Sequence, residues 1–360
     1  MEMSAAPLKD LLVVETAGVL AGPSVGMFFA ELGARVVKLE NAKAGGDSTR
    51  KWKLPKEDPH AKASAYFSSV NWGKEHHMVD LASEDGRKVL DTLLAKADVL
   101  ITNHLAADAE KLGLERDRLR TLNPKLVHGH IKGFADDDAR TAYDVVLQAE
   151  TGYLSMTGTD ADHLAKLPIA MIDVLAAHQL KEGLLLALLQ RTKTGRGALV
   201  EVSLEEAALS ALINQASNAL MAGHVAKPLG TLHPNIAPYG ELFTCADGVR
   251  IVLAVGTDAQ FKALNTVLDT DLRNDQHFTT NAKRVLNRNV LAQLLARSIS
   301  ERNGQELLAA LRAEKVPAGL VRPLNNVLAS PAAQRMTLES MIDGVRTLRL
   351  SGNVFRIEPY

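Results

Sequence analysis

One aspartate stands where a carboxylate could do chemistry. Asp173 follows the small apolar run PIAMI (168–172) and begins a strongly apolar stretch that predicts a helix. One interpretation is structural, because aspartate is a favoured N-cap residue. The other is chemical, because the helix dipole keeps a carboxylate at a helix N-terminus ionised and nearby N–H groups can stabilise developing negative charge. The residues alone favour the cap.

Two glycine-containing segments have the composition of anion-binding loops. In GVLAGP (18–23), glycines let backbone N–H groups and a helix N-terminus approach a phosphate. The segment is not the GxGxxG of dinucleotide folds, although Glu40 ends the next apolar run, where a ribose-binding acid would stand. We therefore expect a structural turn or another phosphate-bearing ligand rather than a nicotinamide cofactor. GGDSTRKWK (45–53) suits either a loop that meets a polyanion or a solvated surface loop.

Other catalytic patterns are weak or missing from the sequence. The histidines have neither HExxH nor a matching carboxylate spacing, so we expect no metal site; those considered are His76, His77, His128, His130, His163 and His178. A GxSxG elbow is also missing. The single cysteine, Cys245, excludes an intrachain disulfide framework, and we interpret it as a buried filler rather than a nucleophile.

The elements that would position these residues alternate between strands and helices over the first 150 residues. LLVVETAG (11–18), a stretch from Gly22 to Leu32 and ARVVKLE (34–40) predict a strand, a helix and a strand. Ser83 can cap the next helix, and the strands DVLITN (98–103) and PKLVHGHIKGF (124–134) follow. This alternation predicts an α/β fold with a doubly wound parallel sheet.

The remainder is more helical. Helices are predicted from Asp144 and over 172–194, ending at Gly195, and a strand and a helix follow over 199–220. A hairpin is expected over 242–256, turning at Asp247-Gly248, before helices return from about 258 to 311. We expect a large domain of residues 1–224 with 326–360 and a small domain of residues 225–325.

Composition narrows the class of protein. The 360 residues are 46% hydrophobic, 41 Lys and Arg balance 42 Asp and Glu, and the net charge is -1, so nucleic acid is not an expected partner. The sequence has neither a signal-like N-terminus nor an apolar run of membrane-spanning length. We expect an unprocessed cytoplasmic protein that does not bind membranes.

A family resemblance changes the balance for Asp173. The chain resembles the class III CoA-transferases, also called the CaiB/BaiF family, over residues 7 to about 340. The segments that carry the resemblance, in order, are ETAGVLAGPSVGMFFAELGARVVKLE, GGDSTR, NWGKEHHMVDLASEDGRKVL, ADVLITN, LNPKLVHGHIKGF, RTKTGRG before a VSL strand, HPNIAPY, AVGTDAQF and VPAGLVRPLNNVLASP. The resemblance implies a Rossmann-like large domain, a smaller α/β domain and an interlocked homodimer. It also places the catalytic aspartate at Asp173.

The family contains CoA-transferases and 2-methylacyl-CoA racemases. The racemases carry a His-Asp pair where this chain has Tyr143 and Asp144. Tyrosine has an ordinary pKa near 10 and is a poor base for an α-proton. The racemases also have a glutamate where this chain reads GTDAQF (256–261). Both differences favour the transferase, with the racemase and a noncatalytic acyl-CoA-binding protein as alternatives.

The resemblance implies covalent catalysis in which CoA and acyl-CoA are substrates and no permanently bound cofactor or metal is used. Ionised Asp173 would attack the donor thioester to give an aspartyl anhydride and then an aspartyl-CoA thioester. The CoA-binding residues implied are Val19, Leu20, Arg50, Val79, Asn103 and Lys111. The substrate-pocket residues implied are Tyr143, Asp144 and His233.

The acids exchanged are a narrower hypothesis. HPNIAPY (233–239) and GTDAQF suggest succinyl-CoA as donor and a small carboxylic or dicarboxylic acid as acceptor. A second carboxylate needs a basic partner, and His233, Arg140 and Arg322 remain open as candidates.

Overall fold

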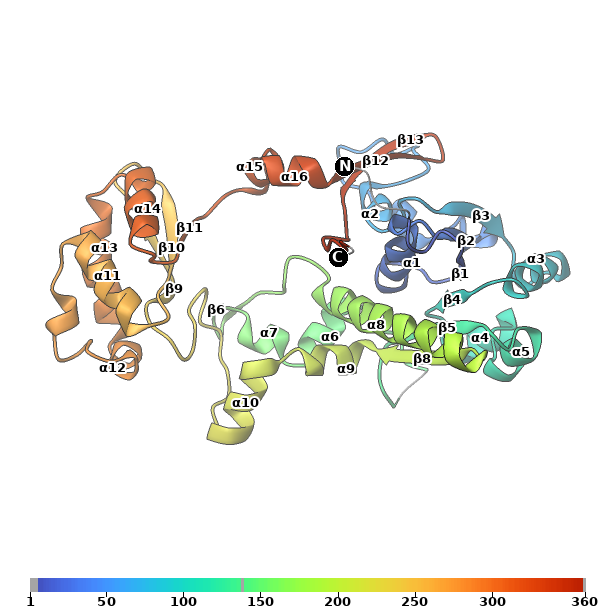
Figure 1. Ribbon diagram of the computed structural model, residues 1–360, viewed down its shortest axis with the longest axis horizontal. Coiled ribbons are helices and arrows are strands. Elements are labelled where there is room, and N and C mark those ends of the chain that lie inside the picture. The colour runs from blue at the N-terminus through green and yellow to red at the C-terminus, as the bar shows by residue number, and fades with distance from the viewer. Residues whose placement is uncertain (1–5, 137–138, 359–360) are drawn as a thin grey trace. The chain divides into compact units, whose positions relative to one another are not determined.

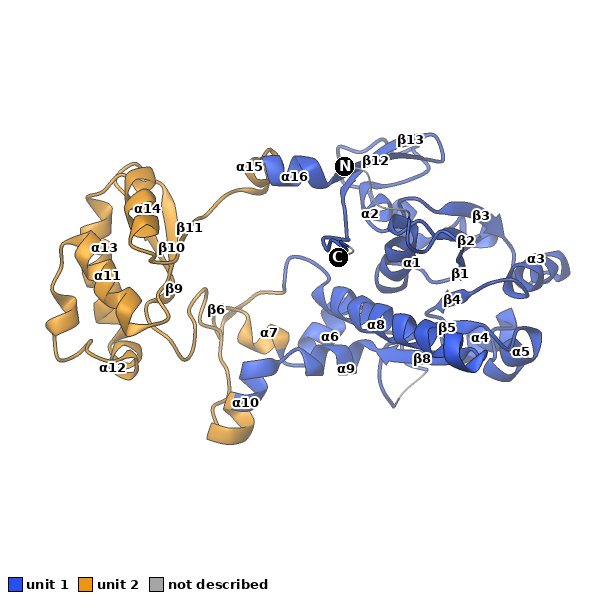
Figure 2. Cartoon of the chain, in the orientation of Figure 1, with its two compact units in different colours: residues 1–152, 167–217, 331–360 blue, residues 153–166, 218–330 orange. Residues whose placement is uncertain are grey.

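The computed structural model describes residues 6–136 and 139–358. The chain packs into two compact units (Figure 2). Unit 1 comprises residues 1–152, 167–217 and 331–360, and unit 2 comprises residues 153–166 and 218–330. Within the described ranges, no helix combines the length and the apolar character that a bilayer crossing requires.

Unit 1 is built on a six-stranded parallel sheet with the order β3-β2-β1-β4-β5-β8 (Figure 1). Its strands are β1 (Leu12–Glu15), β2 (Arg35–Asn41), β3 (Glu75–Val79), β4 (Val99–Thr102), β5 (Val127–Lys132) and β8 (Ala198–Ser203). The chain runs outward from β1 on one side and outward from β4 on the other, so the winding reverses between these two strands. The expected α/β class with a parallel sheet is confirmed.

Alternating side chains of the central strands pack against helices on both faces of the sheet. Val14 and Leu100 belong to a core that includes Leu90 of α3 (Glu84–Leu94) and Leu119 of α5 (Arg116–Leu122). On the other face, Ile101 lies beside α1 (Ala21–Glu31), and β5 lies against α8 (Met171–Thr194). Burial on both faces explains why the central strands are continuous apolar runs.

The predicted helix boundaries in unit 1 agree well with the structure. The hydroxyl of Ser83 caps α3 by accepting the N–H of Gly86 at 3.0 Å. Gly195 ends α8 with a φ of 68°, a conformation that glycine adopts without strain. The other helices of unit 1 are α2 (Ala65–Ser68), α4 (Ala106–Leu112), α6 (Asp144–Glu150), α9 (Leu204–Ser210), α16 (Pro331–Met336) and the 3-10 helices η1 (Ala42–Ala44) and η2 (Ser48–Lys51). Helix α10 (Ile213–Ala222) follows α9 after a break.

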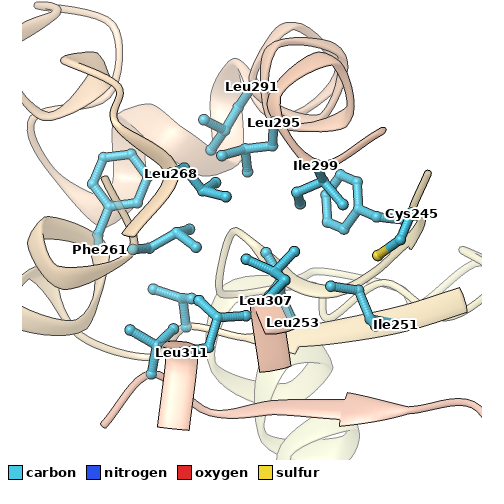
Figure 3. Close-up of a cluster of buried hydrophobic side chains, with 14 of the residues drawn as sticks. Cys245, Ile251, Leu253, Phe261, Leu268, Leu291, Leu295, Ile299, Leu307 and Leu311 are labelled. Carbon is cyan, nitrogen blue, oxygen red and sulfur yellow. The ribbon is translucent and has the colours of Figure 1, made fainter. Parts of the chain in front are cut away.

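Unit 2 has its own antiparallel sheet, with the order β11-β10-β9. The strands are β9 (Tyr239–Thr244), β10 (Arg250–Ala254) and β11 (Ala318–Leu320), and the hairpin turn predicted at Asp247-Gly248 joins the first two. The helices are α7 (Tyr153–Met156), α11 (Asp258–Leu268), η3 (Leu272–Asn274), α12 (Asn281–Leu286), α13 (Arg288–Ser300), α14 (Gly304–Ala313) and α15 (Leu324–Leu328), with a small ribbon of β6 (Gly158–Asp160) and β7 (His163–Leu164). Cys245 is buried in the core of this unit beside Ile251 and Leu253, consistent with the filler interpretation (Figure 3).

Two features of unit 1 were not predicted from the sequence. Strand β3 lies at the edge of the sheet and is mostly polar, so it lacks the apolar run that marks the central strands. The second feature is a hairpin of β12 (Thr337–Ile342) and β13 (Val345–Leu350), which turns at Asp343-Gly344. An Asp-Gly pair between alternating residues is a recognised hairpin signal, so this element was predictable.

Candidate active site

A cavity of about 540 Å³ lies in unit 1 at the carboxyl ends of β1, β4 and β5. The segments that line it include Gly18–Ala21 after β1, Thr102–Ala106 at the end of β4 and Ile131–Gly133 at the end of β5. In doubly wound sheets, ligands bind where the winding reverses, and β1 and β4 are that point here. Five of the predicted site residues line this cavity together: Val19, Leu20, Asn103, Tyr143 and Asp173.

Asp173 is the third residue of α8, not its cap. The helix begins at Met171 with Ala170 in the N-cap position, so the N-cap prediction is wrong. The Asp173 side chain is only 8% exposed, yet it reaches the cavity, and its carboxylate has no hydrogen-bond partner among the described residues. Burial and the negative charge of Asp144 raise the pKa of Asp173 to about 7. Burial therefore outweighs the helix dipole at Asp173, and a pKa of about 7 still leaves an ionised fraction at neutral pH.

Asp144 lies against the start of α8 instead of lining the cavity. Its Oδ2 atom accepts the backbone N–H of Ile172 at 2.7 Å and that of Asp173 at 3.4 Å. Its Oδ1 atom accepts a hydrogen bond from the buried amide of Gln148. Tyr143, the preceding residue, is half exposed at the N-cap of α6 and lines the cavity.

The turn after β1 is held from two directions. Gly18 and Asn103 exchange hydrogen bonds: the Gly18 N–H donates to Oδ1 of Asn103, and Nδ2 of Asn103 donates to the Gly18 carbonyl, each at 3.0 Å. The Val19 N–H donates to Oδ2 of Asp47 at 3.1 Å. Val19 has a φ of 70°, which is unusual for a β-branched residue, so these contacts enforce a strained backbone beside the cavity.

Beneath the turn lies a buried group of four charges, two acidic and two basic. Lys38 Nζ contacts Glu15 at 2.8 Å and Asp47 at 3.3 Å, and Lys74 Nζ contacts Glu15 at 2.8 Å. Lys38 also donates to the carbonyl of Ala17. The formal charges cancel, as buried ions require. This arrangement fixes the chain that leads from β1 into the turn.

Three other predicted site residues of unit 1 do not line the cavity, and a fourth belongs to the other unit. Arg50 is buried. Its Nε and Nη2 atoms donate to Glu40 at 2.6 Å and its Nη1 atom donates to Asp343 at 2.8 Å, so the structure favours a structural role over phosphate binding. Val79 ends the edge strand β3. Lys111 is exposed on α4 and pairs with Asp108 at 3.0 Å. His233 belongs to unit 2.

The cavity also holds residues that the sequence analysis did not select. The hydroxyl of Thr102 contacts Nε2 of His128 and Nδ1 of His130, each at 2.8 Å, and His104 contacts Thr16 at 2.9 Å. Burial lowers the pKa of His104 to about 4 and that of His128 to about 3, so both rings are neutral at pH 7. Two histidines two residues apart in a strand share one face, and this spacing could have identified His128 and His130. The described residues contain no cluster of three or more His, Cys, Asp or Glu that could hold a metal ion.

Three basic side chains line the same cavity. Arg116 is exposed and has no ion pair among the described residues. Lys132 pairs with Glu201 at 3.0 Å. Arg140 lies over the ring of Phe134 at 3.9 Å and donates to Glu150 at 2.8 Å. Four carboxylates line the cavity as well: those of Glu110, Glu115 and Glu201 are on exposed residues, whereas Asp173 is buried.

The chain is similar in sequence to known CoA-transferases. The sequence model of CoA-transferase family III matches residues 8–359. The succinate–glutarate CoA-transferase of Agrobacterium fabrum is 34% identical, and the match covers 95% of this chain and 88% of the relative. The human succinyl-CoA:glutarate CoA-transferase is 30% identical, and the match covers 90% of this chain and 74% of the relative.

A solved structure is similar over nearly its whole length. The crystal structure of a CaiB/BaiF family protein from Brucella suis superposes with a TM-score of 0.84 at 34% identity, covering 98% of this chain and 93% of that one. The resemblance identified in the sequence and the expectation of a CoA-transferase are thereby confirmed. The chain belongs to CoA-transferase family III.

Proposed function

We propose that this enzyme transfers CoA from succinyl-CoA to a dicarboxylic acid, with Asp173 as the covalent nucleophile. The observation that carries the proposal is the position of Asp173, a buried carboxylate without a hydrogen-bond partner among the described residues, in the cavity at the winding reversal. The relatives named for succinyl-CoA and glutarate support the choice of acids.

The first half of the reaction moves CoA onto the protein. A carboxylate oxygen of Asp173 attacks the thioester carbonyl of the donor, the C–S bond breaks, and the CoA thiolate leaves behind an anhydride of Asp173 and the donor acid. The thiolate then attacks the Asp173 carbonyl carbon and the anhydride C–O bond breaks. Succinate departs, and Asp173 carries CoA as a thioester.

The second half repeats these steps in reverse with the acceptor. Its carboxylate attacks the aspartyl thioester to form a new anhydride and thiolate, and the thiolate attacks the acceptor carbonyl to release acyl-CoA and ionised Asp173. No net proton is taken up or released. Because the anhydrides hydrolyse, the limited exposure of Asp173 favours transfer over loss to water.

CoA is proposed to contact the turn after β1 and the end of β4. Val19, Leu20 and Asn103 line the cavity there, and the hydrogen bonds of Asn103 and Asp47 hold the turn in one conformation. Lys111 remains a proposed phosphate partner because its helix contributes three other residues to the cavity wall. Val79 remains a prediction for the edge of the CoA site.

Among the cations considered for the second carboxylate of the acceptor, Arg140 is the best supported. It lines the cavity together with Asp173. His233 remains a proposed substrate contact from unit 2.

The assembly is proposed to be an interlocked cytoplasmic homodimer, in which residues 1–224 with 326–360 form the large CoA-binding domain and residues 225–325 the small one. Helices α8 and α9 expose leucines that a second copy would cover: Leu185, Leu186, Leu189 and Leu209.

Trapping the covalent intermediate tests the proposal. Wild type, Asp173→Ala and the exposed-carboxylate control Asp10→Ala are incubated with succinyl-CoA and hydroxylamine, and the mass of each is measured. A hydroxamate on Asp173 of wild type and the control, and none on Asp173→Ala, is expected. The absence of an adduct in wild type, together with exchange of the α-hydrogen of a 2-methylacyl-CoA for deuterium, would replace the transferase with a racemase.

A further inference from the structure

The N-terminus of α8 is capped by a residue from another helix. The first turn of a helix leaves its N–H groups without intrahelical partners, and Ala170, at the N-cap position, has no side chain that could accept them. Asp144 of α6 supplies the missing acceptor, because its Oδ2 atom lies 2.7 Å from the N atom of Ile172 and 3.4 Å from that of Asp173. The amides nearest to the nucleophile are thus directed to a different carboxylate.

The orientation of Asp144 is itself fixed by a buried relay. Nε2 of Gln148 donates to Oδ1 of Asp144, and Oε1 of Gln148 accepts the N–H of Leu167 at 2.8 Å. Gln148 is 1% exposed, so water does not offer an alternative partner. Both oxygens of Asp144 accept hydrogen bonds, so this position requires a carboxylate. An amide would direct its own N–H donor at one of these donors, the amide of Gln148 or the backbone N–H groups of α8.

We propose that Asp144 is a positioning residue for the nucleophile, which caps α8 from α6 and keeps the first-turn amides off the Asp173 carboxylate. The inference rests on the proposed function, since it assigns to Asp144 a role in the reactivity of Asp173. A carboxylate that neither amide stabilises retains both oxygens for attack, and the fixed helix start holds them toward the cavity.

The electrostatic surroundings agree with this role. Burial and the charge of Asp144 raise the pKa of Asp173, and the charges of Asp173, Asp144 and Asp47, added to burial, raise the pKa of Tyr66. The other titratable side chains on α8 near its start and on the elements packed against it are Glu31, His128, His130, Lys132, Glu150, His178, Lys181, Glu201, Glu205 and Glu206. None of these groups is a cause of the raised pKa of Asp173, which comes from burial and from the charge of Asp144.

Two substitutions separate the cap from its charge. Asp144→Asn removes the negative charge. It also places the NH2 group of an amide where an acceptor is needed, facing either the amide of Gln148 or the backbone N–H groups of α8. Combining it with Gln148→Glu restores the chain of hydrogen bonds, because a carboxylate at position 148 can accept from the amide at position 144 and from the N–H of Leu167. The double variant also moves the negative charge from position 144 to position 148, one side chain further along the relay from Asp173. Ser83→Ala, which removes the cap of α3 in the same unit, is the control for loss of a helix cap alone.

The test is the pH dependence of kcat and kcat/KM, with thermal unfolding measured in parallel. In Asp144→Asn we expect kcat to fall by roughly 10- to 100-fold with little change in the KM for acyl-CoA. We also expect the acid limb of the pH–rate profile to move to lower pH by about one unit. The double variant should recover the Tm of wild type while its acid limb stays below that of wild type. Ser83→Ala should lower Tm without moving the limb.

The result that would overturn the inference is an acid limb of wild-type position in Asp144→Asn, in a preparation that still forms the Asp173 adduct. A double variant with no recovery of Tm would overturn the relay. Failure of the proposed function is a distinct result, because wild type itself would then form no adduct. A cycle of Asp144→Asn and Asp173→Asn followed by thermal unfolding measures the repulsion between the two carboxylates without any turnover.

Discussion

Replacing the carboxylate of Asp173 by an amide is expected to stabilise the folded protein. Burial and the charge of Asp144 raise the pKa of Asp173 from 3.8 to about 7. In the unfolded chain the carboxyl ionises at its ordinary pKa, so between about pH 4 and pH 7 the folded protein holds a proton that the unfolded chain has released. Stability is therefore lost as the pH rises through this range and is not regained above it.

The size of the effect follows from the two pKa values. Each pKa unit corresponds to about 1.4 kcal/mol, so the raised pKa lowers the stability of the folded state by about 4 kcal/mol above pH 7. At pH 5 the loss is about 2 kcal/mol, because the unfolded chain gains by releasing a proton that the folded protein still holds. Because the side chain is 8% exposed, solvent screens little of this cost. Asp173→Asn cannot ionise and should be more stable than wild type by up to these amounts, a gain of several degrees in Tm.

Thermal unfolding of the substrate-free protein from pH 5 to pH 8 measures this gain. Wild type and Asp173→Asn are compared with Asp10→Asn, which removes an exposed carboxylate from the same unit and should change little. The gap between wild type and Asp173→Asn should widen as the pH rises. The reasoning is refuted if Asp173→Asn is no more stable than wild type at pH 8, or if the gap is the same at both ends of the range.

Three further changes probe the support of the cavity. Gly26→Ala should cost roughly 1–3 kcal/mol in urea unfolding, because the added Cβ would lie 1.8 Å from Oε2 of Glu15; an unchanged midpoint would contradict this. Lys38→Met should lower the free energy of unfolding by about 3–5 kcal/mol in the same assay, because the buried carboxylate of Glu15 loses one of its cationic partners. Asn103→Ala should raise the KM for acyl-CoA roughly tenfold in steady-state kinetics, with a smaller effect on kcat, because Gly18 loses both of its hydrogen bonds to this side chain.

The central sheet was predictable because its strands are buried on both faces. Leu12–Glu15 and Val99–Thr102 are short apolar runs followed by small or polar residues, and Ser83 gives α3 a clear cap between two of the strands. Strand β3 could not be found in this way, because an edge strand with exposed side chains needs no apolar pattern. Local sequence predicts an element when burial imposes a pattern on it.

The site was predictable in part. The turn after β1 was identified from its glycines, but the importance of Asp173 came from the family resemblance, since local sequence favoured a cap. The actual cap, Asp144, lies 28 residues away from Ile172 along the chain, and only tertiary packing brings the two together. The same limit applies to Arg50, whose partner Asp343 is 293 residues distant.

The hairpin of β12 and β13 has a consequence for how the molecule is made. Asp343 reaches the buried Arg50, and Arg349 pairs with Glu31, a residue 318 positions earlier. A ribosome adds about 5–20 residues per second, so Glu31 waits roughly 15 to 60 seconds for its partner to be synthesised. During that interval the early strands are exposed to chaperones and proteases with their ion pairs incomplete, and unit 1 reaches its final packing only near the end of translation.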